Sequence, residues 1–396
     1  MTKQTLNIGL FGLGVVGKGL LDVLQNSGLP GVEIKKICVR TPGKPRPVAP
    51  EKLTLHASDI LDDPSINVVV ETISGSEDAF QIVSQAMRKG KNVVTANKKM
   101  VASHFTELLD LQEETGVSLL YESAACGGIP IVRTIEEHFG SEPMEQVSGI
   151  FNGTSNYILS RMFRAGFDFT EALKQAQDLG FAEPDPSSDI DGLDAKYKLI
   201  LLTAHSHGVV AAPEEVLHLG IRHLRSEDVD FAQKQGLKIK LLPVCRRTDP
   251  NRLALFVMPG LVGENDELYH VEDEFNGVQL ETAYSGRQFF RGRGAGGFPT
   301  GSALLSDLAA LQGGYRYPYR KHRLNGRTLL DEDISLKVCV RVPHSVSVGT
   351  LPFEGIEYRE HGAESYRITG RITLKTLKRH AGRLHEQGAF IMRMPE

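Results

Sequence analysis

Cysteine is scarce in this 396-residue sequence, and its four cysteines, Cys38, Cys126, Cys245 and Cys339, lie far apart. No two of them form a CxxC pair, which argues against a zinc knuckle and against a disulfide framework. The spacing suits a reducing cytoplasm. The chain also enters the pattern of a strand directly, so we expect no signal peptide.

An excess of positive charge and long apolar runs are missing as well. The formal net charge is -4, which provides no basic field for nucleic acid and no polybasic membrane anchor. No apolar run is long enough to span a bilayer. Hydrophobic residues make up 41% of the chain and charged residues 24%, as in an ordinary globular protein. The length predicts two or three domains.

The first thirty residues predict a nucleotide site. An apolar run from Leu6 to Phe11 is followed by three spaced glycines and then by a helical pattern, which is the order of the dinucleotide-binding fingerprint. The glycines permit a tight turn, close approach of a pyrophosphate and close helix packing. The alternative is a structural turn. The residues expected to bind the dinucleotide are Gly12, Leu13, Gly14, Val15, Val16 and Gly17.

The end of the second strand, Val32 to Val39, indicates which dinucleotide binds. A site that prefers NAD usually has Asp or Glu there to bind the ribose 2′-hydroxyl, and this chain has Arg40, Lys44 and Arg46 instead. Basic side chains suit a 2′-phosphate, which favours NADP over NAD. A solvated basic loop is the alternative, more for Lys44 and Arg46 than for Arg40.

Strands and helices then alternate, which predicts a right-handed, doubly wound parallel sheet. The expected strands are 67–71, 92–95 and 117–121, and the expected helices are 79–89 and 101–115. Ligands bind at the carboxyl ends of such strands. Ile73 and Ser74 follow one strand, and Thr95 and Lys98 stand at the end of the next.

Residues 121–130 contain two glycines and a proline between a strand and a helix. Such a segment either leaves carbonyl groups to bind a cation or acts as a hinge, and the residues alone favour the hinge. Cys126 lies in this segment. No histidine or carboxylate pattern activates it, so we expect a small buried thiol rather than a nucleophile.

An acidic loop with two prolines leads into a helix that begins near Leu193. Asp194 and Lys198 are four residues apart and share one helical face. The loop either brings a carboxylate and an amine to a reaction site or is a solvated loop with an ordinary ion pair. The stretch alone favours neither. Before it, Thr154 or Ser155 is expected to cap a helix.

The second half of the chain predicts an open mixed sheet and a small C-terminal module of strands and one helix. The strands of the sheet are expected at 237–244, 252–258 and 277–284. The module is expected to contain a strand at 334–342, a hairpin at 355–372, a helix at 374–387 and a strand at 389–394.

Seven motifs, taken together, resemble those of the homoserine dehydrogenases. They are the glycine turn at 12–17, Thr95-Ala-Asn-Lys98, the segment 122–130, Gly153-Thr-Ser-Asn-Tyr157, Gly180-Phe-Ala-Glu183, Gly192-Leu-Asp194-Ala-Lys-Tyr-Lys198 and the segment 292–300. One such motif can arise by chance, but this many in the family's order are hard to explain otherwise. The resemblance covers roughly residues 5 to 325.

The resemblance implies reversible hydride transfer between NAD(P)H and L-aspartate 4-semialdehyde, giving L-homoserine, in the biosynthesis of threonine, methionine and isoleucine. Lys198 matches the family's catalytic lysine, Asp194 the carboxylate beside it, and Lys98 the lysine of an Asn-Lys motif. The positions matched to substrate binding are Glu183, Asp189, Asp194 and Thr154.

The resemblance also implies ligands and partners. Cofactor contacts outside the glycine turn are expected from Arg40, Ile73, Ser74, Thr95, Lys98, Gly180 and Gly296. A monovalent cation, sodium, is expected at Glu122, Ala125, Gly127 and Ile129, held largely by backbone carbonyls. This places the cation interpretation above the hinge. We expect a homodimer formed through the mixed sheet, or a tetramer, with no nucleic-acid or membrane partner.

These patterns predict a division of the chain by function. An NADP-binding Rossmann domain is expected over 1–130 with a return at about 300–328, a catalytic and dimerisation domain over 131–299, and the small module over 330–396. The module is either a shortened form of the ACT regulatory domain found in longer family members or a structural appendage. Feedback inhibition by threonine is therefore not inferred.

Two other functions compete with this interpretation. A Rossmann semialdehyde dehydrogenase that forms a thioester needs an activated cysteine beside a histidine, and neither Cys126 nor Cys245 has that setting. A non-catalytic NADP-binding sensor that uses the tail as a switch has no need of Lys198, Asp194 and Glu183.

Overall fold

The structure is a computed structural model, and it describes residues 4–324, 328–344, 351–362 and 364–395. The chain divides into two compact units. The first comprises the described residues up to Ser141, Ile200–Ala212 and Arg293–Leu324, and the second comprises Glu142–Leu199, Pro213–Gly292 and the described residues after Leu324. Within the described ranges, no helix has the length and apolar character needed to cross a membrane.

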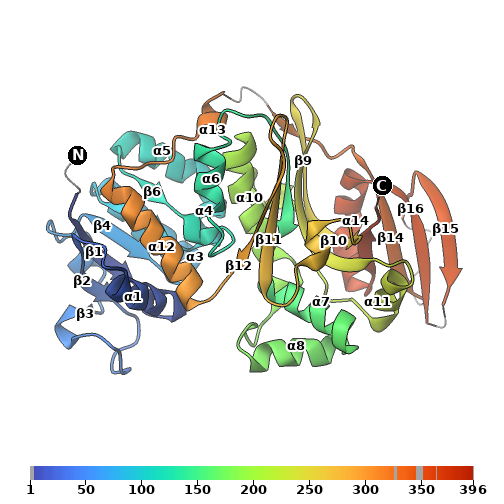
Figure 1. Ribbon diagram of the computed structural model, residues 1–396, viewed down its shortest axis with the longest axis horizontal. Coiled ribbons are helices and arrows are strands. Elements are labelled where there is room, and N and C mark those ends of the chain that lie inside the picture. The colour runs from blue at the N-terminus through green and yellow to red at the C-terminus, as the bar shows by residue number, and fades with distance from the viewer. Residues whose placement is uncertain (1–3, 325–327, 345–350, 363, 396) are drawn as a thin grey trace. The chain divides into compact units, whose positions relative to one another are not determined.

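The first unit is built on a parallel sheet (Figure 1). In its described part, six strands follow the spatial order β3-β2-β1-β4-β5-β6, and all the pairings are parallel. The strands are β1 (Leu6–Phe11), β2 (Val32–Cys38), β3 (Leu53–Thr54), β4 (Val68–Glu71), β5 (Asn92–Thr95) and β6 (Leu119–Leu120). The winding reverses between β1 and β4, where such folds bind dinucleotides. The predicted doubly wound sheet is confirmed.

Helices connect these strands. They are α1 (Val15–Ser27), η1 (Pro50–Lys52), α2 (Ser58–Leu61), α3 (Ser76–Arg88), α4 (Lys98–Ser103), α5 (Phe105–Thr115), η2 (Glu122–Ala124), α6 (Ile131–Glu137), α12 (Gly297–Gln312) and α13 (Arg320–Leu324). The prediction of a single helix over 101–115 is wrong, because two helices, α4 and α5, cover this range. The break lies at His104, whose backbone is not helical (φ -122°, ψ 27°).

Two helices of this unit, α1 and α12, pack closely through glycine. A methyl group at Gly19 would lie 2.0 Å from the carbonyl oxygen of Gly297, and one at Gly301 would lie 2.5 Å from the carbonyl carbon of Gly19. Because the obstructing atoms belong to the backbone, no side-chain rotation relieves these clashes. Glycine therefore permits the later segment to lie against the first helix of the chain.

The second unit is built on a mixed sheet, as predicted. Its described residues form eleven strands, nine of which follow the order β12-β11-β7-β9-β10-β17-β14-β16-β15, while β8 and β13 also pair with β10. The strands are β7 (Met144–Ile150), β8 (Leu217–His218), β9 (Lys238–Asp249), β10 (Arg252–Val262), β11 (Phe275–Thr282), β12 (Gly286–Arg293), β13 (Leu329–Leu330), β14 (Ser335–Pro343), β15 (Gly355–His361), β16 (Ser365–Thr373) and β17 (Phe390–Arg393). Strand β12 was not predicted.

The helices of the second unit are α7 (Gly153–Ala165), α8 (Phe169–Asp178), α9 (Ser187–Ile190), η3 (Pro213–Glu215), α11 (Ser226–Gln233), η4 (Glu267–His270) and α14 (Leu374–Glu386). Helix α10 (Leu193–His207) crosses the boundary between the units after Leu199. The predicted domains divide the chain by function and the compact units divide it by packing. The two divisions therefore differ at residues 131–141, 200–212 and 293–299 and after residue 330.

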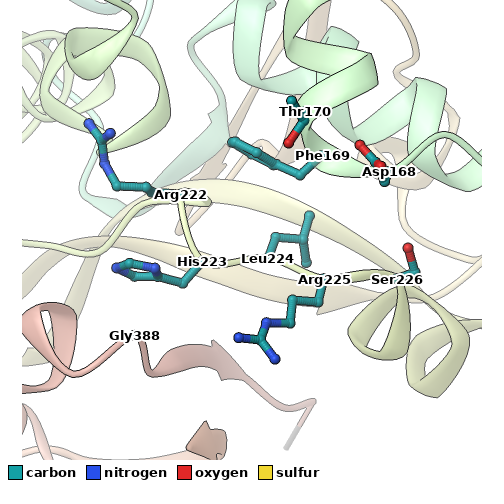
Figure 2. Close-up of a pocket in the computed structure, with 9 residues that line it drawn as sticks. All are labelled: Asp168, Phe169, Thr170, Arg222, His223, Leu224, Arg225, Ser226 and Gly388. Carbon is teal, nitrogen blue, oxygen red and sulfur yellow. The ribbon is translucent and has the colours of Figure 1, made fainter. Parts of the chain in front are cut away.

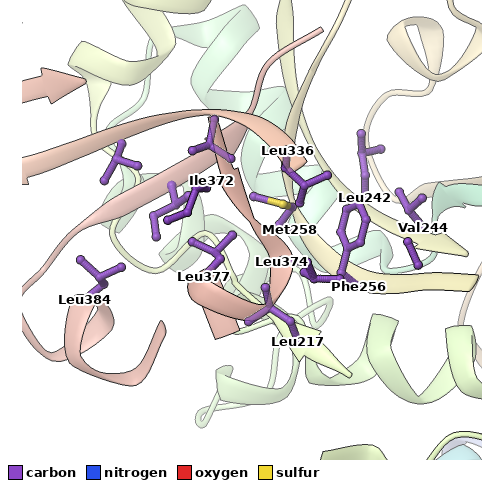
Figure 3. Close-up of a cluster of buried hydrophobic side chains, with 14 of the residues drawn as sticks. Leu217, Leu242, Val244, Phe256, Met258, Leu336, Ile372, Leu374, Leu377 and Leu384 are labelled. Atoms are coloured by element: carbon purple, nitrogen blue, oxygen red, sulfur yellow. The ribbon is translucent and has the colours of Figure 1, made fainter. Parts of the chain in front are cut away.

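The C-terminal residues share the core of the second unit. Phe256 and Met258 of β10 belong to the same buried apolar cluster as Leu336 of β14 and as Leu374 and Leu377 of α14 (Figure 3). The strand, hairpin, helix and last strand predicted after residue 330 are all present. They extend the sheet and the core of this unit instead of forming a separate compact body.

Buried charges reinforce this packing. Arg341 of β14 is 1% exposed, and its Nε donates to both carboxylate oxygens of Asp228 in α11, at 2.9 and 3.0 Å. Arg367 of β16 contacts the same carboxylate at 3.4 Å. Burial raises the pKa of Asp228, and the charge of Arg341 opposes that effect. One buried carboxylate thus joins two C-terminal strands to α11.

The substitution Arg341→Met should loosen this part of the unit, because it leaves Asp228 buried with only the more distant guanidinium as a charge partner. Breaking a buried pair costs about 3 kcal/mol or more. Amide hydrogen exchange in β14, β16 and α11 should accelerate by roughly a hundred-fold. Lys337→Met is the matched control, because Lys337 lies on the same strand in a partly exposed pair with Glu357. Equal effects of the two substitutions would contradict the assignment.

Candidate active site

The glycine turn has the geometry that its sequence predicts. Gly12 has a positive φ of 92°, and the hydroxyl of Thr72 donates to the carbonyl oxygens of Phe11 and Gly12 at 2.9 and 3.1 Å. A methyl group at Gly17 would lie 2.3 Å from the carbonyl oxygen of Gly12. One at Gly14 would meet no described atom within 4 Å. The turn is therefore closed toward the protein and open at Gly14.

The helix that follows this turn presents its amide groups. Gly14 is the N-cap of the 13-residue helix α1, no described side chain caps it, and Val15 is 71% exposed. Such a helix end binds phosphate groups. Gly296, with φ 115°, lies near it, since a methyl group on the next residue, Gly297, would be 3.2 Å from the carbonyl oxygen of Val15. The predicted cofactor position Gly296 thus lies beside the fingerprint turn, with Leu13 and Val16 half-buried within that turn.

The basic loop after β2 presents one guanidinium. Arg46 folds back on its own loop and donates to the carbonyl oxygens of Lys44 and Thr41 at 3.0 and 2.7 Å. Arg40 is exposed and has no hydrogen-bond or ion-pair partner among the described residues. This arrangement distinguishes the two arginines and leaves Arg40 able to bind a phosphate.

A buried carboxylate that was not predicted as a site residue connects two strand ends. Glu71, at the end of β4, accepts hydrogen bonds from the Ile73 amide at 2.6 Å and from the Thr95 hydroxyl at 2.5 Å. Thr95 in turn accepts from the Asn97 amide at 3.0 Å, and Asn97 caps α4, which begins at Lys98. Burial raises the pKa of Glu71 to about 7. The predicted cofactor positions at β4 and β5 are therefore held by one network.

Glu122 is occupied by a structural role. Its carboxylate accepts hydrogen bonds from the amides of Val132 and Arg133 at 2.8 and 2.9 Å, in the first turn of α6. Its own amide donates to Asp307 at 2.9 Å. Burial raises the pKa values of both Glu122 and Asp307. A cation at this position would therefore meet the carbonyl of Glu122 and not its side chain.

The neighbouring carbonyls suit the predicted cation. Cys126 and Gly127 both have a φ of 56°, and the buried carbonyls of Ala125 and Gly127 accept no hydrogen bond from the described residues. Those of Glu122 and Ile129 each accept one. In the same described ranges, no group of three or more His, Cys, Asp or Glu side chains can hold a metal. The donors available for a cation are therefore backbone oxygens. Cys126 is buried, as predicted.

In the second unit, the predicted catalytic pair forms a buried contact at the start of α10. The Lys198 ammonium donates to Asp194 Oδ2 at 2.7 Å and to the carbonyl oxygen of Phe151 at 2.6 Å. Asp194 and Lys198 are 5% and 6% exposed. An ammonium has three N–H donors, so these two contacts leave a third for a ligand. This geometry rules out the solvated ion pair.

Asn152, which was not singled out in the sequence, organises the carboxylates. Its side-chain amide donates to Asp189 at 2.6 Å and to Asp194 at 3.0 Å. Its oxygen accepts from the Ser155 amide at 2.7 Å and so caps α7. The prediction that Thr154 or Ser155 caps this helix is wrong. An asparagine just before Gly153 was the available signal, because asparagine is a preferred N-cap.

The remaining substrate positions lie in the first turn of α7 and on the loop before α9. Thr154 donates to the carbonyl oxygen of Phe181 at 2.7 Å, which holds this loop against α7. Gly180 begins the loop with a φ of 76°, and the side chain of Glu183 is exposed. Asp191 accepts from Arg222 at 2.7 and 2.8 Å, which fixes the turn between α9 and α10.

The structure therefore sorts the predicted residues by unit. Asp194 and Lys198 are in direct contact, and Asp189 joins them through Asn152. The glycine turn, Arg40, Lys98, Gly296 and the cation segment belong to the first unit. Ser74 is exposed beyond the end of β4, and Lys98 is half-buried.

The pKa of Glu71 makes the stability of the first unit depend on pH. The folded-state pKa, about 7, lies above the ordinary value of 4.5, so the stabilising contribution is complete below pH 4.5 and is lost as pH rises through about 7. The shift corresponds to about 3 kcal/mol. Glu71→Gln should flatten the free energy of unfolding between these limits, measured by urea unfolding. Glu51→Gln, at an exposed position, should not. An unchanged pH dependence in Glu71→Gln would contradict the raised pKa of Glu71.

Comparisons with known proteins identify the family of this chain. The family model described as "Homoserine dehydrogenase, NAD binding domain" matches residues 12–122, and the one described as "Homoserine dehydrogenase" matches residues 130–309. The homoserine dehydrogenase of Bacillus subtilis is 38% identical over 318 residues, which cover 78% of this chain and 73% of that protein. That of Synechocystis is 40% identical over 320 residues, covering 78% and 74%.

Solved structures extend the similarity. The homoserine dehydrogenase of Thiobacillus denitrificans superposes with a TM-score of 0.86 at 31% identity, over 99% of this chain and 98% of that chain. A hyperthermophilic archaeal homoserine dehydrogenase, solved in complex with NADPH, gives a TM-score of 0.68 at 26% identity, over 79% and 99%. The aligned lengths and identities, and the order of the two family models, lead to one conclusion: the chain belongs to the homoserine dehydrogenase family, whose members are NAD(P)-dependent oxidoreductases.

Proposed function

We propose that the protein catalyses reversible hydride transfer between L-homoserine and L-aspartate 4-semialdehyde, with NADP(H) as the preferred cofactor. The observation that carries this proposal is the buried Lys198 ammonium, which two acceptors orient and which keeps one N–H for a substrate oxygen. Membership in the homoserine dehydrogenase family supplies the reaction class.

Lys198 donates a proton to the substrate oxygen in one direction and accepts it in the other. The nicotinamide of a bound cofactor supplies the hydride donor or acceptor. When the aldehyde is reduced, its oxygen becomes an alkoxide, and the Lys198 ammonium stabilises and protonates that oxygen. In the reverse direction the same amine takes up the hydroxyl proton. Asp194 keeps the ammonium in position. The hydride passes directly between substrate and cofactor, and no covalent intermediate is needed.

Other side chains bind and orient the substrate. The exposed carboxylate of Glu183 is available to pair with the substrate's α-ammonium group. We assign Asp189 and Thr154 to substrate binding as well, and their contacts with Asn152 and Phe181 support that role. Lys98, at the start of α4, is the second cation proposed to face the reacting oxygen.

The first unit binds the cofactor. The open turn at Gly14 and the uncapped start of α1 support pyrophosphate binding there. The exposed guanidinium of Arg40 supports a preference for NADP, because it can pair with the 2′-phosphate. Ile73, Ser74, Thr95 and Gly296 are the further cofactor contacts that we propose in this unit, and Gly180 is one that we propose in the second unit.

A monovalent cation, sodium, would bind the carbonyl oxygens of Ala125 and Gly127, with those of Glu122 and Ile129 beside them. Two buried carbonyls without a hydrogen-bond partner among the described residues support this assignment. The cation would fix the segment between β6 and α6.

We also propose a homodimer formed through the mixed sheet, with a tetramer as the alternative. A cytoplasmic location is proposed from the cysteine spacing.

The reaction is tested by absorbance of the reduced nicotinamide, with purified protein, L-homoserine, and NADP or NAD in parallel. Reduction of NADP faster than of NAD is the expected result. Cofactor binding in calorimetry without reduction of either dinucleotide would contradict the proposal and would indicate a non-catalytic sensor.

Lys198→Met should lower kcat by roughly a hundred-fold or more, because removing a well-placed donor to an oxyanion costs about 3 kcal/mol. Affinity for NADP, measured by fluorescence, should persist and would show that the variant is folded. Lys174→Met, at an exposed lysine of α8 paired with Asp178, is the control and should keep normal turnover. Normal turnover in Lys198→Met would refute the catalytic assignment.

Arg40→Ala should raise KM for NADPH by about ten-fold, since a hydrogen bond between charged groups contributes roughly 1.5 kcal/mol or more. KM for NADH should change little. Arg46→Ala is the matched control, and its effect should be smaller because the Arg46 guanidinium is already bound by its own loop. Equal effects of Arg40→Ala on both cofactors would disprove the role of Arg40.

A further inference from the structure

A pocket separate from the proposed substrate site lies within the second unit, between the start of α10 and helix α14. We call it the α10–α14 pocket. Its volume is about 400 Å3. One wall comes from the first turns of α10 and from residues 213–220. The other comes from one face of α14, at Lys378, Ala381, Gly382 and His385. None of its lining residues takes part in the proposed reaction.

The pocket contains a buried lysine without a partner. Lys196 is 7% exposed, and its ammonium has no hydrogen-bond or ion-pair partner among the described residues. The Lys196 ammonium lies 5.8 Å from the centroid of the Tyr197 ring. Burial lowers the pKa of Lys196, and the negative charge of Glu214 opposes this effect. Because an unpaired buried charge is costly, this ammonium favours a bound anion.

The acidic groups around Lys196 do not pair with its ammonium in place of a bound anion. The Nδ1 atom of His218 is 2.9 Å from the carbonyl oxygen of Asp191 and donates to it, which leaves Nε2 as its remaining polar atom. Burial lowers the pKa of His218, as do the charges of Lys196 and His385. The carboxylate of Asp191 is taken by Arg222, and Glu214 is exposed. The interior of the pocket is therefore basic.

The rest of the pocket lining is mostly apolar and leaves open space for a ligand. Its apolar members are Leu193, Pro213, Val216, Leu217, Leu219 and Ala381. On α14, a methyl group added at Gly382 would meet no described atom within 4 Å. A ligand for this pocket therefore combines one negative charge for Lys196 with an aliphatic portion for these walls. A phosphate dianion, with no apolar part, fits this lining less well.

A neighbouring pocket is also lined by basic side chains, but its arginines already have partners. It is lined by Arg222, His223 and Arg225 among others (Figure 2). Arg222 is held by Asp191, and Arg225 lies 3.8 Å from Glu227 and 3.9 Å from Glu364. Figure 2 shows these two guanidinium groups pointing away from each other. Both arginines already have carboxylate partners, so that pocket lacks the unpaired cation that marks the α10–α14 pocket.

We propose that the α10–α14 pocket is a binding site for a small carboxylate with an aliphatic tail. The carboxylate binds the Lys196 ammonium, and the tail packs against the apolar wall and the open space at Gly382. The ligand bridges α10 and α14. This site is additional to the proposed reaction, and its test does not depend on that reaction.

Calorimetric titration of the full chain with 4-methylpentanoate tests the proposal. One saturable site is expected, with 4-methylpentan-1-ol, acetate and inorganic phosphate each binding at least roughly ten-fold more weakly. Lys196→Met should lose ten-fold or more in affinity, and its melting temperature without ligand should not fall, because an unpaired buried charge is removed. Lys375→Met, at a largely exposed lysine of α14 outside the pocket, is the control and should bind normally.

A second variant leaves the charges in place. Gly382→Leu should fill the pocket and abolish binding while the helix persists, since leucine favours helix over glycine. Absence of saturable binding by the wild-type protein would overturn the proposal. Normal binding by Lys196→Met or by Gly382→Leu would also overturn it, as would phosphate binding more tightly than 4-methylpentanoate.

Discussion

The contact between the Lys198 ammonium and the Asp194 carboxylate is the constraint on which the rest of the proposed site depends. Two charges this deeply buried need further hydrogen-bond partners besides each other. The Phe151 carbonyl meets that need for the lysine and the Asn152 amide meets it for the aspartate. Strand β7, helix α7 and helix α10 must therefore meet at one point, and the Lys198 ammonium is fixed where they do.

The other parts of the fold serve the same need for rigid positions. In the first unit, Glu71 joins two strand ends through Ile73 and Thr95, so the backbone at these strand ends is held by side chains as well as by the sheet. In the second unit, the C-terminal strands extend the sheet that carries β7, and the pair of Arg341 with Asp228 fixes them to α11. The C-terminal residues thus contribute to stability, and they form one wall of the α10–α14 pocket.

Much of this was readable from the sequence where a local pattern determines the structure. The apolar run Leu6–Phe11 and the glycines after it predicted β1, its turn and α1, because steric limits at glycine act over a few residues. The spacing of Asp194 and Lys198 likewise predicted a shared helical face, and the structure brings the two side chains into contact.

What escaped prediction depends on residues that are distant in sequence. Asn152 caps α7 locally, but its contacts with Asp189 and Asp194 cross about forty residues. Glu71 read as the end of an apolar strand, and only the neighbouring strand supplies Thr95. The break at His104 and the extension of the sheet by β14 through β17 likewise follow from tertiary packing, which overrides local helix and strand preference.

The most direct test of the central claim follows the hydride itself. L-Homoserine carrying two deuterium atoms on its hydroxyl-bearing carbon would be incubated with the protein and NADP, and the products analysed by mass spectrometry. Direct transfer predicts NADPH with one deuterium and an aldehyde that retains the other. Reduced cofactor without deuterium, or no reduced cofactor, would contradict the account.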